Sequence, residues 1–110
     1  MMRLIISNSF SLNMLPASMV QANIELKRCD PKVVIASLRE ANMLSVVGHA
    51  DTAAVFTSVI GREVVFNRTS YNWQDGDTLL VGQYSGPRLP EGTTILPEGA
   101  GICWYVINIT

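Results

Sequence analysis

The chain has 110 residues, of which 48% are hydrophobic and only 15% are charged, and its formal net charge is −1. This composition excludes a disordered chain, and the length allows hardly more than one domain, residues 1–110. A net charge near zero excludes a protein that coats long DNA or RNA, which needs a basic surface, but it is compatible with a small nucleotide held by a few groups.

The sparse charge and the positive mean hydropathy indicate apolar surface that is buried against a partner, for which a homodimer is the default. No apolar run approaches the roughly 20 residues of a membrane span, and residues 4–6 are too short for a secretion signal. We therefore expect a cytoplasmic protein without a membrane partner. Two cysteines and one histidine indicate reduced thiols, no metal and no cofactor.

The first part of the chain predicts a strand and then a polar loop. Residues 3–7 form a short apolar run that is typical of a buried strand. Asn8, Ser11 and Asn13 lie in the loop that follows, and Ser11 or Asn13 is suited to cap a short helical turn ended by Pro16. A loop after a strand is a common position for ligand-binding groups, although asparagine and serine are also ordinary turn residues.

A second strand and a helix are expected next. Residues 17–29 alternate between polar and apolar side chains, which predicts a strand with one face in the core. Asp30 and Pro31 are signals for the start of a helix, as N-cap and first helical residue, and the apolar spacing carries this helix to about residue 43.

The remaining segments complete a mixed fold. Residues 51–60 have a helical pattern that Gly61 is suited to end. Short apolar runs that predict strands occupy residues 62–66, 78–83 and 102–109. The sequence thus predicts an α/β (α+β) domain with a mixed sheet of about five strands and helices packed on it.

His49 is the only histidine, and it lies between Gly48 and the helix expected over residues 51–60. Free backbone N–H groups at the start of a helix attract anions, so this junction is a plausible place for phosphate chemistry. The alternative is a structural histidine that is held by hydrogen bonds at the surface.

Metal-free cleavage of RNA requires groups that transfer protons and groups that bind phosphate, and this chain contains both. The 2′-oxygen attacks its own phosphate, so a group must accept or orient the 2′-proton and another must protonate the leaving 5′-oxygen. Histidine titrates near neutral pH and suits such proton transfer. Arg68 and Arg88 are suited to grip phosphate, and Glu91 follows Arg88 closely.

Four segments, taken in order, resemble the motifs of the viral ring nuclease family. They are residues 8–15 (Asn-Ser-Phe-Ser-Leu-Asn-Met-Leu), 48–53 (Gly-His-Ala-Asp-Thr-Ala), 67–68 (Asn-Arg) and 88–96 (Arg-Leu-Pro-Glu-Gly-Thr-Thr-Ile-Leu). The resemblance implies a homodimer that binds cyclic tetra-adenylate, the second messenger of type III CRISPR systems, in a pocket across its interface. It also implies metal-independent cleavage to linear products with a 2′,3′-cyclic phosphate, an anti-CRISPR activity in the host cytoplasm.

The resemblance also implies the roles of individual residues. By similarity, His49 and Glu91 are catalytic. The residues that bind the ligand would be Asn8, Ser11, Asn13, Arg68, Arg88 and Gln83.

One segment departs from the family. Residues 97–101 (Pro-Glu-Gly-Ala-Gly) cannot form the acidic helix that often follows in relatives, so the edge of the pocket is expected to differ. Two alternatives remain: a dimer of the same fold that binds the cyclic nucleotide without cleaving it, and a small interaction protein without a nucleotide ligand.

Overall fold

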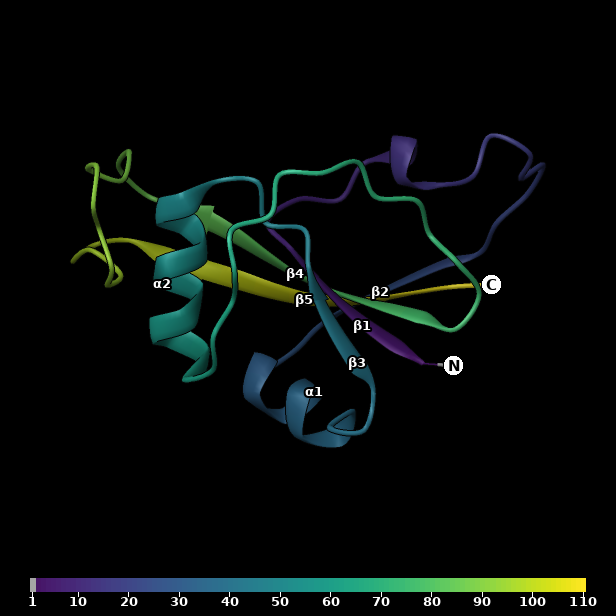
Figure 1. Ribbon diagram of the computed structural model, residues 1–110, viewed down its shortest axis with the longest axis horizontal. Helices are drawn as coiled ribbons and strands as arrows, with labels where there is room; N and C mark the ends of the chain where they lie inside the picture. Colours follow the sequence, from purple (N-terminus) through teal and green to yellow (C-terminus); the bar gives the residue numbers. More distant parts are fainter. Residues whose placement is uncertain (1) are drawn as a thin grey trace.

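A five-stranded mixed β-sheet forms the centre of the molecule (Figure 1). The computed structural model describes residues 2–110. The strands are β1 (Arg3–Ser7), β2 (Ile24–Arg28), β3 (Asn42–Ser45), β4 (Asp77–Ser85) and β5 (Gly101–Ile109). The helices are the 3-10 turn η1 (Leu12–Met14), α1 (Pro31–Ser37) and α2 (Ala50–Ile60). The α+β fold class predicted from the sequence is confirmed.

The order of the strands is β2-β5-β4-β1-β3. Strand β1 is parallel to both of its neighbours, β3 and β4, whereas β5 is antiparallel to β4 and β2. The carboxyl ends of β1, β3 and β4 therefore meet at one edge of the sheet, which is where ligands bind in many folds with parallel strands.

The two faces of the sheet are covered differently. Both helices cover one face, where Phe56 of α2 packs with Leu80 and Trp104 in one apolar cluster. The other face carries Ile5, Leu79 and Ile107 and is covered by the loops on either side of η1 and before β4. Alternate residues of each strand point to opposite faces, so the continuous apolar runs of β1 and β4 serve both clusters.

Gly82 of β4 lies directly beneath two aromatic rings on the face of the sheet that the helices cover. A Cβ atom at this position would lie 2.6 Å from Cζ of Phe56 and 2.7 Å from Cζ3 of Trp104. The centroids of these two rings are 4.7 Å apart. Only glycine allows α2 and β5 to approach each other this closely.

We expect Gly82→Ala to lower the free energy of unfolding by about 2 kcal/mol, because the added methyl overpacks the core. Urea denaturation would measure the change. Gly101→Ala is the matched control, since nothing lies within 4 Å of a Cβ there. Equal stability of Gly82→Ala and wild type would show that the rings move apart freely.

Several signals for the ends of helices are confirmed. Asp30 caps α1, with its side chain accepting a hydrogen bond from the N–H of Lys32, and Pro31 is the first helical residue. Gly61 ends α2 in the left-handed conformation, at φ 78°. Ser11 caps η1.

Residues 62–66 do not form the predicted strand. Among residues 2–110, the one β-bridge of this segment joins Phe66 to Val47, which lies just beyond the end of β3. Side chains satisfy its backbone instead: the hydroxyl of Ser45 donates to the carbonyl of Val65 over 2.6 Å, and that of Thr57 accepts from the N–H of Val64 over 2.9 Å. Local side-chain bonds of this kind compete with a sheet ladder.

The helix predicted over residues 31–43 is shorter, and a strand was missed. Helix α1 ends at Ser37, and the N–H of Ala41 donates to the carbonyl of Leu38 in the turn that follows. Residues Asn42–Ser45 then form β3, which is parallel to β1. The fifth strand of the sheet is therefore β3 rather than residues 62–66.

The strand predicted over residues 17–29 is confined to β2, and the expected core face is absent. All five residues of β2 are exposed, including Ile24 and Leu26, and β2 lies at the edge of the sheet.

None of the helices between Met2 and Thr110 combines the length and the apolar character that crossing a lipid bilayer requires. Both Cys29 and Cys103 are free thiols. Burial raises the pKa of Cys29, and the neighbouring carboxylate of Asp30 raises it further, so this thiol is disfavoured as a nucleophile.

Candidate functional site

The segments that leave the carboxyl ends of the parallel strands supply the candidate residues. Asn8 follows β1 directly, and Gly48 and His49 follow β3 after two buried valines. Residues 86–100 form the loop between β4 and β5, which projects beyond the sheet near α2 (Figure 1). Three distant parts of the chain thus meet at one edge.

His49 is the N-cap residue of α2. Its backbone is extended, and its Nδ1 accepts a hydrogen bond from the N–H of Thr52 at 3.3 Å. The hydroxyl of Thr52 also lies 3.3 Å from Nδ1. A neutral ring can accept from the N–H, whereas a protonated ring can donate from Nδ1 to the hydroxyl. Thr52 therefore offers Nδ1 both a donor and an acceptor.

Asn8 and Arg68 border the junction between β3 and α2. Oδ1 of Asn8 accepts a hydrogen bond from the N–H of Gly48 at 3.4 Å. The side chain of Arg68 lies over Gly48, since a Cβ there would be 3.5 Å from Cγ of Arg68. Asn67 holds this arginine in place, because its N–H donates to the carbonyl of Val47 over 2.9 Å.

The loop of residues 86–100 closes a hollow of about 470 Å³ against the start of α2. We call it the histidine hollow; it is lined by His49, Asp51, Arg88, Leu89, Pro90 and Glu91. A second hollow of about 400 Å³ shares His49, Arg88 and Leu89 with it and adds Thr52, Tyr84 and Gly86. The two hollows adjoin each other at these shared residues.

The charged groups of the histidine hollow are accessible to a ligand. His49, Arg88 and Glu91 are all exposed, and in residues 2–110 no ion pair engages Arg88 or Glu91. A guanidinium can hold phosphate with two donors, while an imidazole and a carboxylate can exchange protons with it. The histidine hollow therefore has the functional groups for phosphoryl chemistry.

Five of the eight predicted residues do not line the histidine hollow: Asn8 and Arg68 at the junction described above, and Ser11, Asn13 and Gln83. Ser11 caps η1 and Asn13 lies within it, and η1 lies well apart from the loop of residues 86–100 along the long axis (Figure 1). There the hydroxyl of Ser11 accepts from the N–H of Asn13 over 3.2 Å. Gln83 is exposed on β4 opposite Cys103 and lines neither hollow.

The sequence did not single out Asp51 and Thr52 as site residues, although both were expected in the first turn of a helix. Asp51 lines the histidine hollow, and its Oδ1 accepts a hydrogen bond from the N–H of Gly92 over 3.1 Å. The signal for Asp51 in the sequence is its place two residues after His49, within the segment 48–53 that carries the resemblance.

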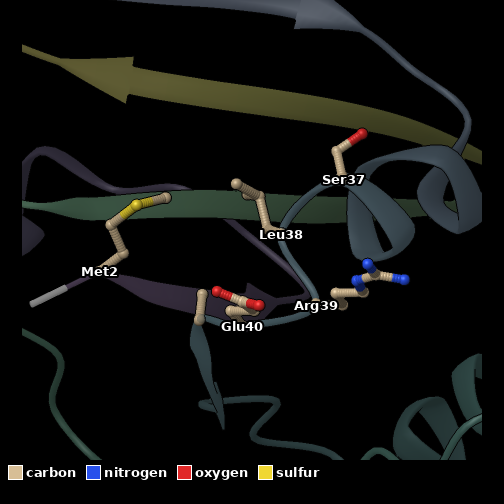
Figure 2. A pocket seen from close by; sticks show the side chains of 6 residues that line it. Met2, Ser37, Leu38, Arg39 and Glu40 are labelled. Carbon is tan, nitrogen blue, oxygen red and sulfur yellow. The ribbon is translucent and has the colours of Figure 1, made fainter.

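A third hollow lies beyond the end of α1, away from these groups. It measures about 500 Å³ and is lined by Met2 and residues 37–41. Figure 2 shows Met2 and Leu38 pointing toward one another across it, with Arg39 directed elsewhere. None of the predicted site residues contributes to it. In the described part of the chain, no three His, Cys, Asp or Glu side chains are grouped so that they could hold a metal ion.

Comparison with known proteins gives a family. No curated protein has a significantly similar sequence. Among solved structures, B116 of Sulfolobus turreted icosahedral virus (STIV) superposes with a TM-score of 0.74 at 22% sequence identity, covering 96% of this chain and 97% of B116. This likeness shows that the two proteins share a fold. The model of the family described as STIV B116-like matches residues 4–99, so the chain belongs to the STIV B116-like family of viral proteins.

Proposed function

We propose that the protein is a metal-independent phosphodiesterase, a ring nuclease that cleaves cyclic tetra-adenylate and so silences type III CRISPR signalling. The observation that carries the proposal is the meeting of His49, Arg88 and Glu91 around one open hollow. These three are among the residues that the resemblance of the sequence to ring nucleases assigns to catalysis and ligand binding.

In the proposed reaction the 2′-oxygen forms a bond to phosphorus while the bond from phosphorus to the 5′-oxygen breaks. Glu91 accepts the proton of the 2′-hydroxyl, and protonated His49 donates a proton from Nε2 to the leaving 5′-oxygen. The hydroxyl of Thr52 accepts from Nδ1 of the protonated ring. Arg88 neutralises the charge that develops on the phosphate. The products end in a 2′,3′-cyclic phosphate and a 5′-hydroxyl.

The proposal includes a homodimer in the host cytoplasm. The edge strand β2 is exposed throughout, with Leu26 at 53% relative exposure, and this supports a protein partner. A ring of four nucleotides is also larger than the drug-sized ligands that hollows of about 300–1,000 Å³ hold, so two copies of the histidine hollow suit it better than one. Two-fold symmetry would match two equivalent cuts in the ring.

Incubation of the purified protein with labelled cyclic tetra-adenylate in EDTA tests the proposal. We expect linear products with a 2′,3′-cyclic phosphate. Products that form only after a divalent metal is restored would contradict the metal-independent mechanism.

A second function is favoured by the hydrogen bond between His49 and Thr52. Because Nδ1 of His49 already caps α2, the histidine has a structural purpose that requires no catalysis. In that case the protein is a sponge that retains the cyclic nucleotide intact. Retention of the uncleaved ring in the EDTA experiment would support this second function.

We expect Arg88→Ala to weaken the affinity for cyclic tetra-adenylate about tenfold and to lower turnover as well, because the guanidinium faces the hollow and has no partner among residues 2–110. Isothermal titration with the uncleaved ring, using a catalytically inactive background, measures the affinity. Arg62→Ala removes the same charge from an exposed position outside the hollow and is the control. An unchanged affinity for Arg88→Ala would show that Arg88 does not contact the ligand.

A further inference from the structure

The loop of residues 86–100 is tied to the rest of the molecule at few points. Its ends are fixed where Ser85 pairs with Gly101 in the ladder of β4 and β5. Near its start, the hydroxyl of Tyr84 donates to the carbonyl of Pro87 over 2.5 Å. Three hydrogen bonds within the loop follow: the N–H and the hydroxyl of Thr93 donate to the carbonyl of Pro90, and the N–H of Ala100 donates to that of Pro97. These contacts do not locate the middle of the loop relative to α2.

One hydrogen bond does connect the middle of the loop to α2. The N–H of Gly92 donates to Oδ1 of Asp51 over 3.1 Å, and within residues 2–110 no other hydrogen bond joins residues 88–96 to the helix. Gly92 has φ +81°, a left-handed conformation that turns its N–H in a direction that other residues rarely reach. The contact therefore depends on both residues.

This hydrogen bond lies between the two halves of the proposed catalytic pair. Asp51 is two residues after His49, and Gly92 is the residue after Glu91. The separation between the imidazole and the carboxylate of Glu91 therefore depends on the distance from Asp51 to Gly92. Proton transfer groups must stay within hydrogen-bonding reach of the substrate, and a displacement of about 1 Å can cost up to about 100-fold in rate.

We propose that Asp51 is a positioning residue, which holds the loop of Arg88 and Glu91 against His49 by accepting the hydrogen bond of Gly92. The inference rests on the proposed function, because it assigns Asp51 a part in the same site. Asp51 does not itself transfer a proton. It acts as a hydrogen-bond acceptor, and its negative charge is not required.

The acceptor and the charge are separated by two variants. Asp51→Ala removes both, whereas Asp51→Asn keeps an Oδ1 acceptor and removes only the charge. Glu98→Ala is the matched control, since it removes a carboxylate from the same loop outside the histidine hollow. Thermal unfolding of each variant verifies that α2 remains folded.

Amide hydrogen exchange of peptides that cover residues 88–95 is the first readout, and it needs no substrate. We expect Asp51→Ala to exchange there about threefold to tenfold faster, the range for losing one exposed hydrogen bond. Asp51→Asn and Glu98→Ala should exchange like wild type. Unchanged exchange in Asp51→Ala, or equally fast exchange in Asp51→Asn, would overturn the inference.

Turnover of cyclic tetra-adenylate is the second readout. We expect kcat of Asp51→Ala to fall about tenfold with KM changed less than about threefold, and Asp51→Asn to restore kcat. A loop that exchanges faster while kcat stays at the wild-type value would also overturn the positioning role. If wild type cleaves nothing, the proposed function fails, and the exchange rates alone still decide whether Asp51 holds the loop.

Discussion

His49→Ala is expected to lower the turnover of cyclic tetra-adenylate by about 100-fold or more, while the affinity for the uncleaved ring stays within about threefold of wild type. The size of the effect is the usual one for the loss of an acid–base group. The affinity should persist because, in the proposed complex, Arg88 rather than His49 holds the phosphate. Single-turnover kinetics and equilibrium titration measure the two quantities separately.

His49→Ala also removes the N-cap of α2, so a second variant is required. Asparagine is among the best N-cap residues, and its side-chain oxygen can accept the hydrogen bond from Thr52 that Nδ1 of His49 accepts now. His49→Asn therefore preserves the cap and removes only the titratable ring. We expect it to be as inactive as His49→Ala but more stable by about 1 kcal/mol. If His49→Asn turns over at close to the wild-type rate, His49 is not catalytic and serves only as the N-cap of α2.

The order of strands and helices could be predicted where local signals were strong. Residues 3–7 form β1 as predicted, and the caps Asp30, Pro31 and Gly61 bound their helices as expected. These signals are local, because they depend on backbone geometry within one turn of the chain. No glycine or proline separates the end of α1 from β3. The apolar pattern alone therefore predicts that the helix continues to about residue 43. Residues 42–45 form β3 instead because they pair with β1, which is distant in the sequence.

Residues 62–66 show the converse error. Their β-branched pattern suits a strand, but the hydroxyls of Ser45 and Thr57 satisfy the backbone of Val64 and Val65. These partners come from β3 and α2, so the outcome depends on contacts between distant parts of the chain. A pattern within five residues cannot contain that information.

The candidate site could be predicted in part for a related reason. The three residues of the hollow meet because they follow parallel strands: His49 comes after β3, and Arg88 and Glu91 lie in the loop after β4. The resemblance of the sequence motifs had already assigned all three to one site. The hydrogen bond from Gly92 to Asp51 depends on the path of a loop of 15 residues between paired ends, which no periodicity describes. Five predicted residues lie outside the hollow of a single subunit, and their assignment to the ligand stays a prediction: Asn8, Ser11, Asn13, Arg68 and Gln83.

A buried carboxylate at the start of β4, that of Asp77, is expected to make a large contribution to the stability of the fold. Asp77 is 5% exposed and receives hydrogen bonds from Nε and Nη2 of Arg3, both at 2.7 Å. The hydroxyl of Tyr71 and the N–H of Gln74 donate to its other lone pairs. Arg3 begins β1, so this network joins two central strands and holds the loop before β4 over the apolar face.

Asp77→Asn is expected to lower the free energy of unfolding at pH 7 by about 3 kcal/mol. The substitution leaves the guanidinium of Arg3 without its counter-ion, and breaking a buried ion pair at one partner costs about 3–5 kcal/mol. The lower value applies because Arg3 is partly exposed, at 26% of its side chain. Urea denaturation measures the loss, and Tyr71→Phe, which removes one neutral donor, should cost only about 1 kcal/mol.

The loss should depend on pH in a defined direction. Burial alone would raise the pKa of Asp77, but the hydrogen bonds from Arg3, Tyr71 and Gln74 outweigh it, so the pKa is lowered. The stabilisation is therefore complete above the unfolded pKa of about 3.9 and declines as pH falls toward the folded value. The stability difference between wild type and Asp77→Asn should be constant from about pH 7 to pH 5 and shrink between about pH 4 and pH 2. Other carboxylates titrate in both proteins and cancel in this difference, so a difference that stays constant down to pH 2 would mean that the ion pair does not perturb Asp77.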